Sequence, residues 1–268
     1  MIDTNCPNPI EIYNRYITVK NEEKAAVRNK NNHKKYSASG AGLCIRKHWY
    51  DYNGYDKKQS QADDLRRMRL GTVMGEDFDK AIEWFAAMDL EAQIPYPYPQ
   101  DLKFYCEKPV SHKKLKINGH FDLLIVATIE DGTRLGYLFD YKTSHSFKFK
   151  NLFGRKKDPN PSNNYEFQLG TYGFMIEDDG SFCDKIQYMA NIYINKDNSV
   201  MKMKEAHPVY MDYAKNYWTI VNKYQSKDEP PAFSQGDSGR APYKTWECGK
   251  YCAFTDVCDS PYKKKEEV

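Results

Sequence analysis

Two short segments constrain the fold of this chain more than any other feature. Gly119-His120-Phe121-Asp122 and Asp140-Tyr141-Lys142-Thr143-Ser144 each fall on a predicted β-strand. Side chains alternate between the two faces of a strand, so Asp140 and Lys142 project from the same face. These segments predict neighbouring strands that bring two carboxylates and one lysine together on a sheet.

The register of this strand pair decides whether Asp122 and Asp140 meet. The strands are expected at residues 116–129 and 134–141, with the turn Glu130-Asp131-Gly132-Thr133 between them. A two-residue loop at Asp131-Gly132 would place Asp122 opposite Tyr141. A three-residue loop ending at Gly132, or a β-bulge, would place it opposite Asp140. We therefore predict an odd-length loop or a bulge.

The remaining hydrophobic pattern predicts helices around this sheet. Further helices are expected at residues 65–89, 163–178 and 209–224, a helical stretch from Ser37 to Tyr50, and further strands at 104–110 and 185–194. This order favours one α/β domain, a central mixed β-sheet flanked by helices. We expect a flexible or loosely helical arm at residues 1–36, the domain at 37–260 with its core at about 65–227, and a charged tail at 261–268.

Composition limits the classes of partner. The 40 Lys and Arg against 37 Asp and Glu give a net charge of only +3, so a nucleic-acid site must come from local arrangement. No apolar run is long enough to cross a membrane, and the N-terminus lacks the pattern of a leader. We expect a cytoplasmic protein without a membrane partner.

Asp122, Asp140 and Lys142 are the minimum set for metal-assisted phosphodiester hydrolysis. Carboxylate oxygens select Mg²⁺ or Mn²⁺, which stabilises charge on a phosphate and lowers the pKa of a bound water. Lys142 would orient or help deprotonate that water, or stabilise the developing charge. The alternative is an ordinary strand whose Asp-x-Lys forms a surface ion pair, and the adjoining Gly-x-x-Asp favours the site.

Two predicted helices add candidates. Gln168 and Tyr172 lie one turn apart on one helix face and could hold a phosphate or the attacking water; the alternative is helix packing. On the upstream helix, Glu76 lies beside the apolar stripe and could reach a cleft, or be a solvated glutamate. Asp77 and Asp79 are further acids there.

Together these motifs, Gly-x-x-Asp, Asp-x-Lys and Gln-x-x-x-Tyr with an upstream helix acid, resemble the PD-(D/E)XK nuclease superfamily, RecB-type exonuclease branch. The resemblance implies a restriction-endonuclease-like core. It also implies metal ligation by Asp122, Asp140 and the backbone carbonyl of Tyr141, with Lys142 as a catalytic residue.

The same resemblance assigns the helix positions. Gln168 and Tyr172 match the helix motif of the branch. Relatives often have a histidine four residues after the glycine of the upstream helix, where this chain has Gly75. Glu76, the next residue, is taken as the replacement metal ligand.

Three closely spaced cysteines, Cys248, Cys252 and Cys258, need a fourth partner to bind a metal, and Cys44 is the natural candidate. Four thiolates hold either a [4Fe–4S] cluster or a zinc ion, and spacing alone permits both. The one-plus-three layout resembles the iron–sulfur clasp of RecB-type nucleases, including the CRISPR-associated RecB-like exonuclease family. That resemblance implies a 4Fe-4S cluster joining the N- and C-terminal parts. The remaining cysteines, Cys6, Cys106 and Cys183, are interpreted as plain thiols.

The function expected from this resemblance is a metal-dependent DNA exonuclease acting on single-stranded ends in recombination, repair or processing. Residues 147–157, which are basic and aromatic, follow the Asp140 strand directly and are a candidate strand-guiding loop. The alternatives are a CRISPR spacer-acquisition nuclease within a complex, a non-catalytic iron–sulfur DNA-binding protein, and a zinc-bound interaction module. DNA is the expected partner, and an oligomer or a nuclease complex is a further possibility.

Overall fold

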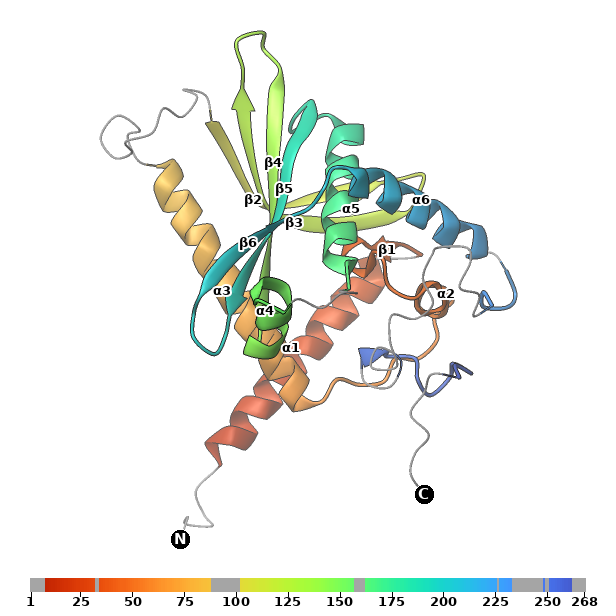
Figure 1. Cartoon of the computed structure of the whole chain (residues 1–268). Coiled ribbons are helices and arrows are strands. Elements are labelled where there is room, and N and C mark those ends of the chain that lie inside the picture. Colours follow the sequence, from red (N-terminus) through yellow and green to blue (C-terminus); the bar gives the residue numbers. More distant parts are fainter. Residues whose placement is uncertain are drawn as a thin grey trace.

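A mixed β-sheet of six strands forms the centre of the part of the chain that the structure, a computed structural model, describes (Figure 1). That part comprises residues 8–31, 34–87, 102–156, 162–225, 227–232, 248 and 251–261. The strands are β1 (Tyr36–Ser37), β2 (Leu102–His112), β3 (Ile117–Thr128), β4 (Arg134–Ser144), β5 (Lys185–Asn195) and β6 (Met201–Glu205). The helices are α1 (Pro9–Asn31), η1 (a 3₁₀ turn, Ala38–Gly40), α2 (Ile45–Tyr52), α3 (Ala62–Ala86), α4 (Ser146–Phe153), α5 (Asn164–Asp179) and α6 (Val209–Tyr224).

The strand order is β1-β3-β4-β5-β6, and β2 pairs with β3 outside this path. β4 is antiparallel to β3 and parallel to β5, so the sheet is mixed. The α/β class and the mixed sheet flanked by helices are confirmed. The sequence prediction did not include α4, β1 or β6. No helix in the described ranges is long and apolar enough to span a lipid bilayer.

Helices α5 and α6 bury the main hydrophobic core against the sheet. Gly170 permits their close contact, because a Cβ there would lie 2.1 Å from the carbonyl oxygen of Tyr210. Trp218 of α6 is fully buried, and its Nε1 donates a hydrogen bond of 2.9 Å to Oγ1 of Thr171 on α5. Gly180 ends α5 with a φ of +66°, the left-handed cap predicted by a glycine just past a helix.

Helix α3 contacts the sheet along a narrow line. Gly71 faces Thr143, Phe78 stacks on Tyr141 at 4.6 Å between ring centroids, and Phe85 meets Phe104. Leu70 and Val73, which we expected on the buried stripe, are exposed. The predicted stripe was therefore too wide, because these three ring and glycine contacts come from residues spaced seven apart.

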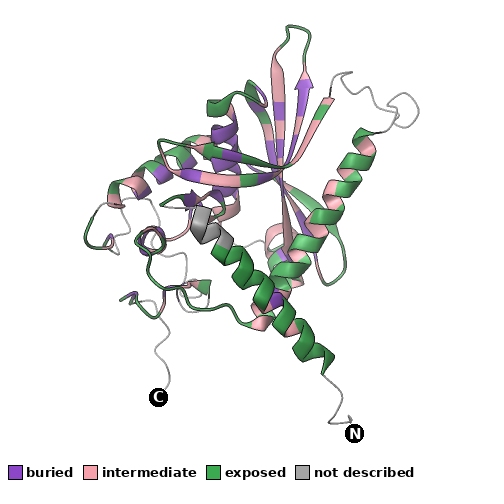
Figure 2. Ribbon diagram, turned by 180° about the vertical axis from the view of Figure 1, so that it is seen from behind, coloured by how far each residue is buried: buried purple, intermediate pink, exposed green. Residues whose placement is uncertain are grey.

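The N-terminal region contains helix α1, which packs on α3. Ile17 is buried, and Asn14 accepts a hydrogen bond from Arg66 of α3. Much of the remaining surface of α1 and α3 is exposed (Figure 2). Cys6, Lys157 and residues 262–268 of the tail lie outside the described residues.

Candidate active site

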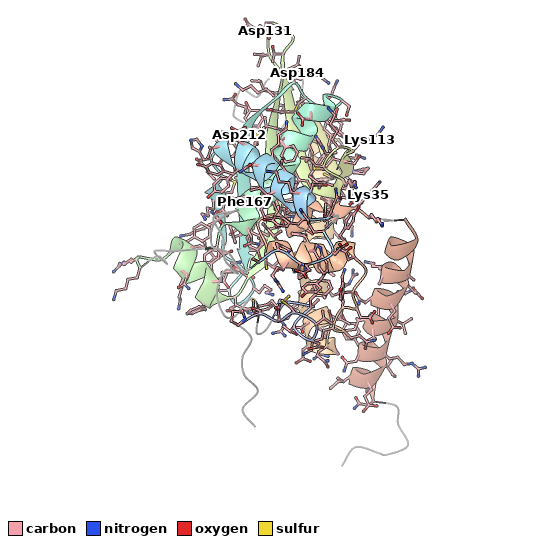
Figure 3. The ribbon with its side chains drawn as sticks, turned by 90° about the vertical axis from the view of Figure 1, so that its right-hand side faces the viewer. Lys35, Lys113, Asp131, Phe167, Asp184 and Asp212 are labelled. Atoms are coloured by element: carbon pink, nitrogen blue, oxygen red, sulfur yellow. The ribbon has the colours of Figure 1, made fainter. Side chains whose placement is uncertain are left out.

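The hairpin between β3 and β4 has the predicted odd-length loop. Glu130, Asp131 and Gly132 form a three-residue loop, closed by a hydrogen bond of 3.0 Å from the Ile129 amide to the Thr133 carbonyl. Gly132 has a φ of +85°, which favours glycine. The resulting register pairs Leu123 with Phe139, as the prediction required. The loop lies at one end of the molecule, where Asp131 is labelled in Figure 3.

The two strands part at the first carboxylate. The β3–β4 pairing ends at Leu123 and Phe139, one position before Asp122 and Asp140. Asp122 Oδ2 accepts a hydrogen bond of 2.6 Å from the backbone N–H of Tyr141, in place of a strand-to-strand bond. Earlier in β3, residues 117 and 118 pair with β1 instead. The edge of β3 between these two pairings therefore has no paired strand next to Asp122.

An irregularity in β2 accompanies this parting. Phe121 and Leu124 both join the core on the α5 side, although residues three apart on a regular strand face opposite sides. The pairs Cys106–Leu123 and Lys108–Phe121 leave Glu107 opposite Asp122 without a ladder bond. Glu107 has a φ of +47°, rare for a residue other than glycine. Glu107 on β2 therefore lies directly opposite Asp122 on β3.

Asp140 lies at the centre of the site. Its side chain is 1% exposed, forms an ion pair with Nζ of Lys142, and accepts a hydrogen bond of 3.0 Å from Nε2 of Gln168. Asp140 and Lys142 thus lie on one face, and α5 supplies the amide. On β5, the buried Asn191 stands in register with Asp140, and its amide has no hydrogen-bond partner among the described residues.

Tyr172 closes the site from α5. A Cβ at Gly119 would lie 2.8 Å from the Tyr172 ring and 2.9 Å from the side chain of Ala38, so only glycine fits there. Tyr172 is buried, and burial followed by the charges of Asp140 and Asp122 raises the pKa of its hydroxyl. The glycine of Gly-x-x-Asp therefore lets the helix approach the strand that carries Asp122.

Burial raises the pKa of both carboxylates in the site. Burial, and then the charge of Asp140, raises the pKa of Asp122 to about 8. Burial likewise raises the pKa of Asp140, although Lys142 opposes this shift. For Lys142, burial favours the neutral amine, but the carboxylates of Asp140 and Asp122 outweigh it and raise its pKa. Two carboxylates sharing one ammonium would favour a bound cation.

Two acids of α3, Glu76 and Asp77, lie apart from this pair, whereas Asp79 is half-buried and faces Cys106 of β2. Glu76 is exposed and accepts a hydrogen bond of 3.2 Å from Nη1 of Arg69, and Asp77 is also exposed. Within the described ranges, no three His, Cys, Asp or Glu side chains form a group able to hold a metal ion. The structure therefore does not bring Glu76 to Asp122 and Asp140. At Gly75, a Cβ would meet no atom within 4 Å, so a larger side chain would fit.

Glu107 is an acid near this site that the sequence analysis missed. Burial, and then the charges of Asp79 and Asp140, raises the pKa of Glu107. Its own charge contributes to the raised pKa of Asp122. The register of β2 against β3 would have predicted that Glu107 lies opposite Asp122. The connection at residues 113–116 contains no glycine or proline that would fix this register.

The four cysteines singled out in the sequence line one cavity. Cys44, Cys248, Cys252 and Cys258 border it. Contacts around the cavity join α2 to the C-terminal segment: Arg46 donates a hydrogen bond of 2.7 Å to the Pro231 carbonyl and pairs with Asp259. The amide of Lys58 also donates to the Ala253 carbonyl at 2.8 Å. The structure therefore brings these cysteines to one place without forming a metal-ligand group among the described residues.

Comparison with known proteins identifies the family. The sequence model of the PD-(D/E)XK nuclease superfamily matches residues 38–259, and the chain belongs to this superfamily. It is thus a nuclease by family. No curated protein matches the chain.

Two solved structures are similar in outline. The protein SSO0001 is 14% identical, with a TM-score of 0.45, and the match covers 92% of this chain and 96% of that one. A protein of Eubacterium rectale, provisionally named an exonuclease, is 13% identical with a TM-score of 0.47, and the match covers 87% of this chain and 92% of that one.

Proposed function

We propose that this nuclease is a metal-dependent DNA exonuclease that acts on single-stranded ends in recombination, repair or processing. The observation that carries the proposal is the convergence of Asp122, Asp140 and Lys142 where β3 parts from β4. The unpaired edge of β3 beside these groups is where a phosphodiester would be placed.

The donor set suits a hard divalent cation. Asp122, Asp140 and the backbone carbonyl of Tyr141 would hold Mg²⁺ or Mn²⁺, which prefer oxygen ligands. When bound, the ion would polarise the phosphodiester and acidify a water. Glu76 would have to leave Arg69 to become a further ligand. The raised pKa values of the two buried carboxylates support this assignment, because a bound cation would favour their ionised form in place of a proton.

The protein side chains have separate roles. Lys142 orients the attacking water or stabilises negative charge on the phosphate, since its ammonium lies beside Asp140. Gln168 fixes the orientation of the Asp140 carboxylate through its amide. Tyr172 packs behind Gly119 and keeps water from the back of the site.

We also propose that Cys44, Cys248, Cys252 and Cys258 hold a [4Fe–4S] cluster. Four cysteines around one cavity fit this group, and Arg46 and Lys47 in its lining would offset the negative charge of the thiolates. Anaerobically purified protein should then be brown and contain about four irons and four sulfides per chain. A colourless protein with one zinc ion would contradict the cluster and support the zinc alternative.

The exonuclease proposal is tested by a cleavage time course on end-labelled linear and on circular single-stranded DNA, with Mn²⁺, Mg²⁺ or EDTA. We expect metal-dependent shortening of linear DNA and intact circles. Cutting of circles would contradict exonuclease specificity. Binding of DNA without cleavage in either metal would contradict the nuclease assignment and favour the non-catalytic alternative, in which Gly75 replaces the helix histidine.

A further inference from the structure

Helix α4 follows the Asp140 strand and is firmly anchored on one side. Phe149 is buried and packs against Phe153 at 4.8 Å between ring centroids, and Phe153 meets the buried Tyr193 of β5 at 5.5 Å. At the start of the helix, the Ser146 amide donates a hydrogen bond of 2.8 Å to Oδ2 of Asp197. The helix therefore presents a fixed outer face to solvent (Figure 1).

That outer face is aromatic and basic. Phe147 is 78% exposed, the most exposed large hydrophobic side chain among the described residues. Lys148 and Lys150 beside it are also exposed, as are Arg155 and Lys156 just beyond the helix. The sequence from 141 to 156 contains no acidic residue. An exposed ring among cations differs from an ordinary solvated helix face, which carries both signs of charge.

One aromatic ring connects this face to the candidate active site. The Nζ of Lys142 lies 4.9 Å from the centroid of the Tyr165 ring, and the Nζ of Lys148 lies 4.0 Å from it. The proposed catalytic lysine and the first lysine of α4 therefore share one ring. The chain from Lys142 to the end of α4 contributes no acidic side chain to this path, and Asp197, beside the start of α4, accepts a hydrogen bond from the Ser146 amide.

We propose that the exposed face of α4 binds the single-stranded DNA that enters the active site, with Phe147 stacked on a base and Lys148 and Lys150 at phosphates. This inference rests on the proposed function, since it names the element that guides its substrate. Single strands fit this face because their unpaired bases can stack on a protruding ring, whereas duplex bases are already stacked. The lysines match the phosphate charge.

The test is the affinity for a fluorescent single-stranded oligonucleotide in EDTA, measured by anisotropy with the full chain. Phe147→Ala should weaken binding about five- to 150-fold, the range for removing a stacking ring. Tyr213→Ala on α6 is the matched control, because Tyr213 is also a largely exposed helical aromatic. Figure 3 shows α6, where Asp212 is labelled, apart from α4. The control should bind like the wild type.

Charge provides a second readout. Lys150→Gln should weaken binding and reduce the slope of log affinity against log salt by about 0.7, the value for one lost contact to a single-strand phosphate. Phe147→Ala should leave that slope unchanged. Affinity of Phe147→Ala within about twofold of the wild type would overturn the inference. The inference would also be overturned if Phe147→Ala weakened binding of an RNA oligonucleotide but not of single-stranded DNA.

A small substrate separates failure of this inference from failure of the proposed function. Thymidine 5′-p-nitrophenyl phosphate is a diester too short to extend along α4, so its hydrolysis by wild-type protein with Mn²⁺ tests the site alone. Hydrolysis with unchanged binding by Phe147→Ala would overturn the α4 inference while the nuclease chemistry stands. Weakened binding by Phe147→Ala without hydrolysis would support the α4 inference and contradict the proposed function.

Discussion

The carboxylate of Asp122 accepts a hydrogen bond of 2.6 Å from the backbone N–H of Tyr141, across the point where β3 leaves β4. A side chain thus takes the place of the next strand-to-strand bond. The bond fixes one oxygen of Asp122 next to the strand that carries Asp140. The same parting of the strands leaves the edge of β3 next to Asp122 without a paired strand, so the irregularity of the sheet shapes the site.

The buried carboxylate of Asp122 should destabilise the metal-free protein at alkaline pH. Its folded pKa of about 8 lies above the unfolded value of 3.8, so the folded state binds more protons between these values. Its contribution to stability is therefore full below about pH 4 and is lost as pH rises through about 8. Asp122→Asn should raise the melting temperature of metal-free protein at pH 9 more than at pH 5, while abolishing cleavage.

Thermal unfolding of both proteins at pH 5 and pH 9 in EDTA, followed by circular dichroism, measures the difference. Asp131→Asn is a suitable control, because Asp131 is an exposed loop carboxylate whose pKa is lowered by its hydrogen bonds to Thr133. Equal effects of Asp122→Asn at both pH values would contradict the burial of an ionising carboxylate at this site.

Gln168 should act through Asp140. Gln168→Leu removes the amide that donates to Asp140 Oδ1 and leaves a buried carboxylate oxygen without that bond. Loss of a hydrogen bond to a charged group costs about 1.5–3 kcal/mol, so kcat should fall about ten- to a hundredfold. The pH–rate profile should also shift to higher pH, because the Asp140 carboxylate loses a stabilising donor. A fall in kcat without that shift would indicate a purely structural role.

Substitution of Glu107 should lower the affinity for Mn²⁺ more than substitution of Glu76. Glu107 stands opposite Asp122 and its charge influences that carboxylate, whereas Glu76 pairs with Arg69 at the surface. Glu107→Gln should weaken Mn²⁺ binding about fivefold, and Glu76→Gln should change it less. Mn²⁺ titration followed by electron paramagnetic resonance measures both. A larger loss for Glu76→Gln would support the assignment of Glu76 as the helix ligand.

His48 should make stability sensitive to acid. It is buried against Tyr36 and Trp218, and its Nε2 lies 2.9 Å from the Gly40 carbonyl oxygen. Burial, and then the charge of Lys47, lowers its pKa to about 4. The unfolded state binds a proton first, so the contribution is full above about pH 6.5 and is lost as pH falls to about 4.

The loss should approach about 3 kcal/mol, as expected for a pKa shift of this size. Denaturant unfolding between pH 7 and 4 measures it. His48→Phe should show a shallower dependence on pH, even though the variant loses the contact with Gly40. An equally steep dependence in His48→Phe would place the acid sensitivity elsewhere in the protein.

Local chemistry explains which parts of the fold the sequence could predict. Gly132 and the turn around it determined the β3–β4 register, and Gly180 marked the end of α5. Helix α4 was missed because Phe147, Phe149 and Lys148, Lys150 alternate with a period of two, a pattern typical of strands. Tertiary contacts stabilise the helix there: Phe153 packs on Tyr193 of β5, and Asp197 accepts a hydrogen bond from the Ser146 amide.

The site was predictable only in part for a similar reason. Asp140 and Lys142 share a strand, so their common face follows from alternation alone. Glu107 depends on a positive φ and on a second strand pairing, neither of which has a signal in the sequence. The position of Glu76 depends on the rotation of α3, which is determined by its contact with Tyr141 and Thr143.

The most direct test of the account is the rate of metal-dependent cleavage of single-stranded DNA by Lys142→Ala against the wild type. Loss of a group that stabilises charge at the phosphate should lower the single-turnover rate at least about a hundredfold in Mn²⁺. DNA binding in EDTA should remain measurable, and circular dichroism should show that the variant is folded. Cleavage by Lys142→Ala at close to the wild-type rate would contradict the placement of the active site at Asp122, Asp140 and Lys142.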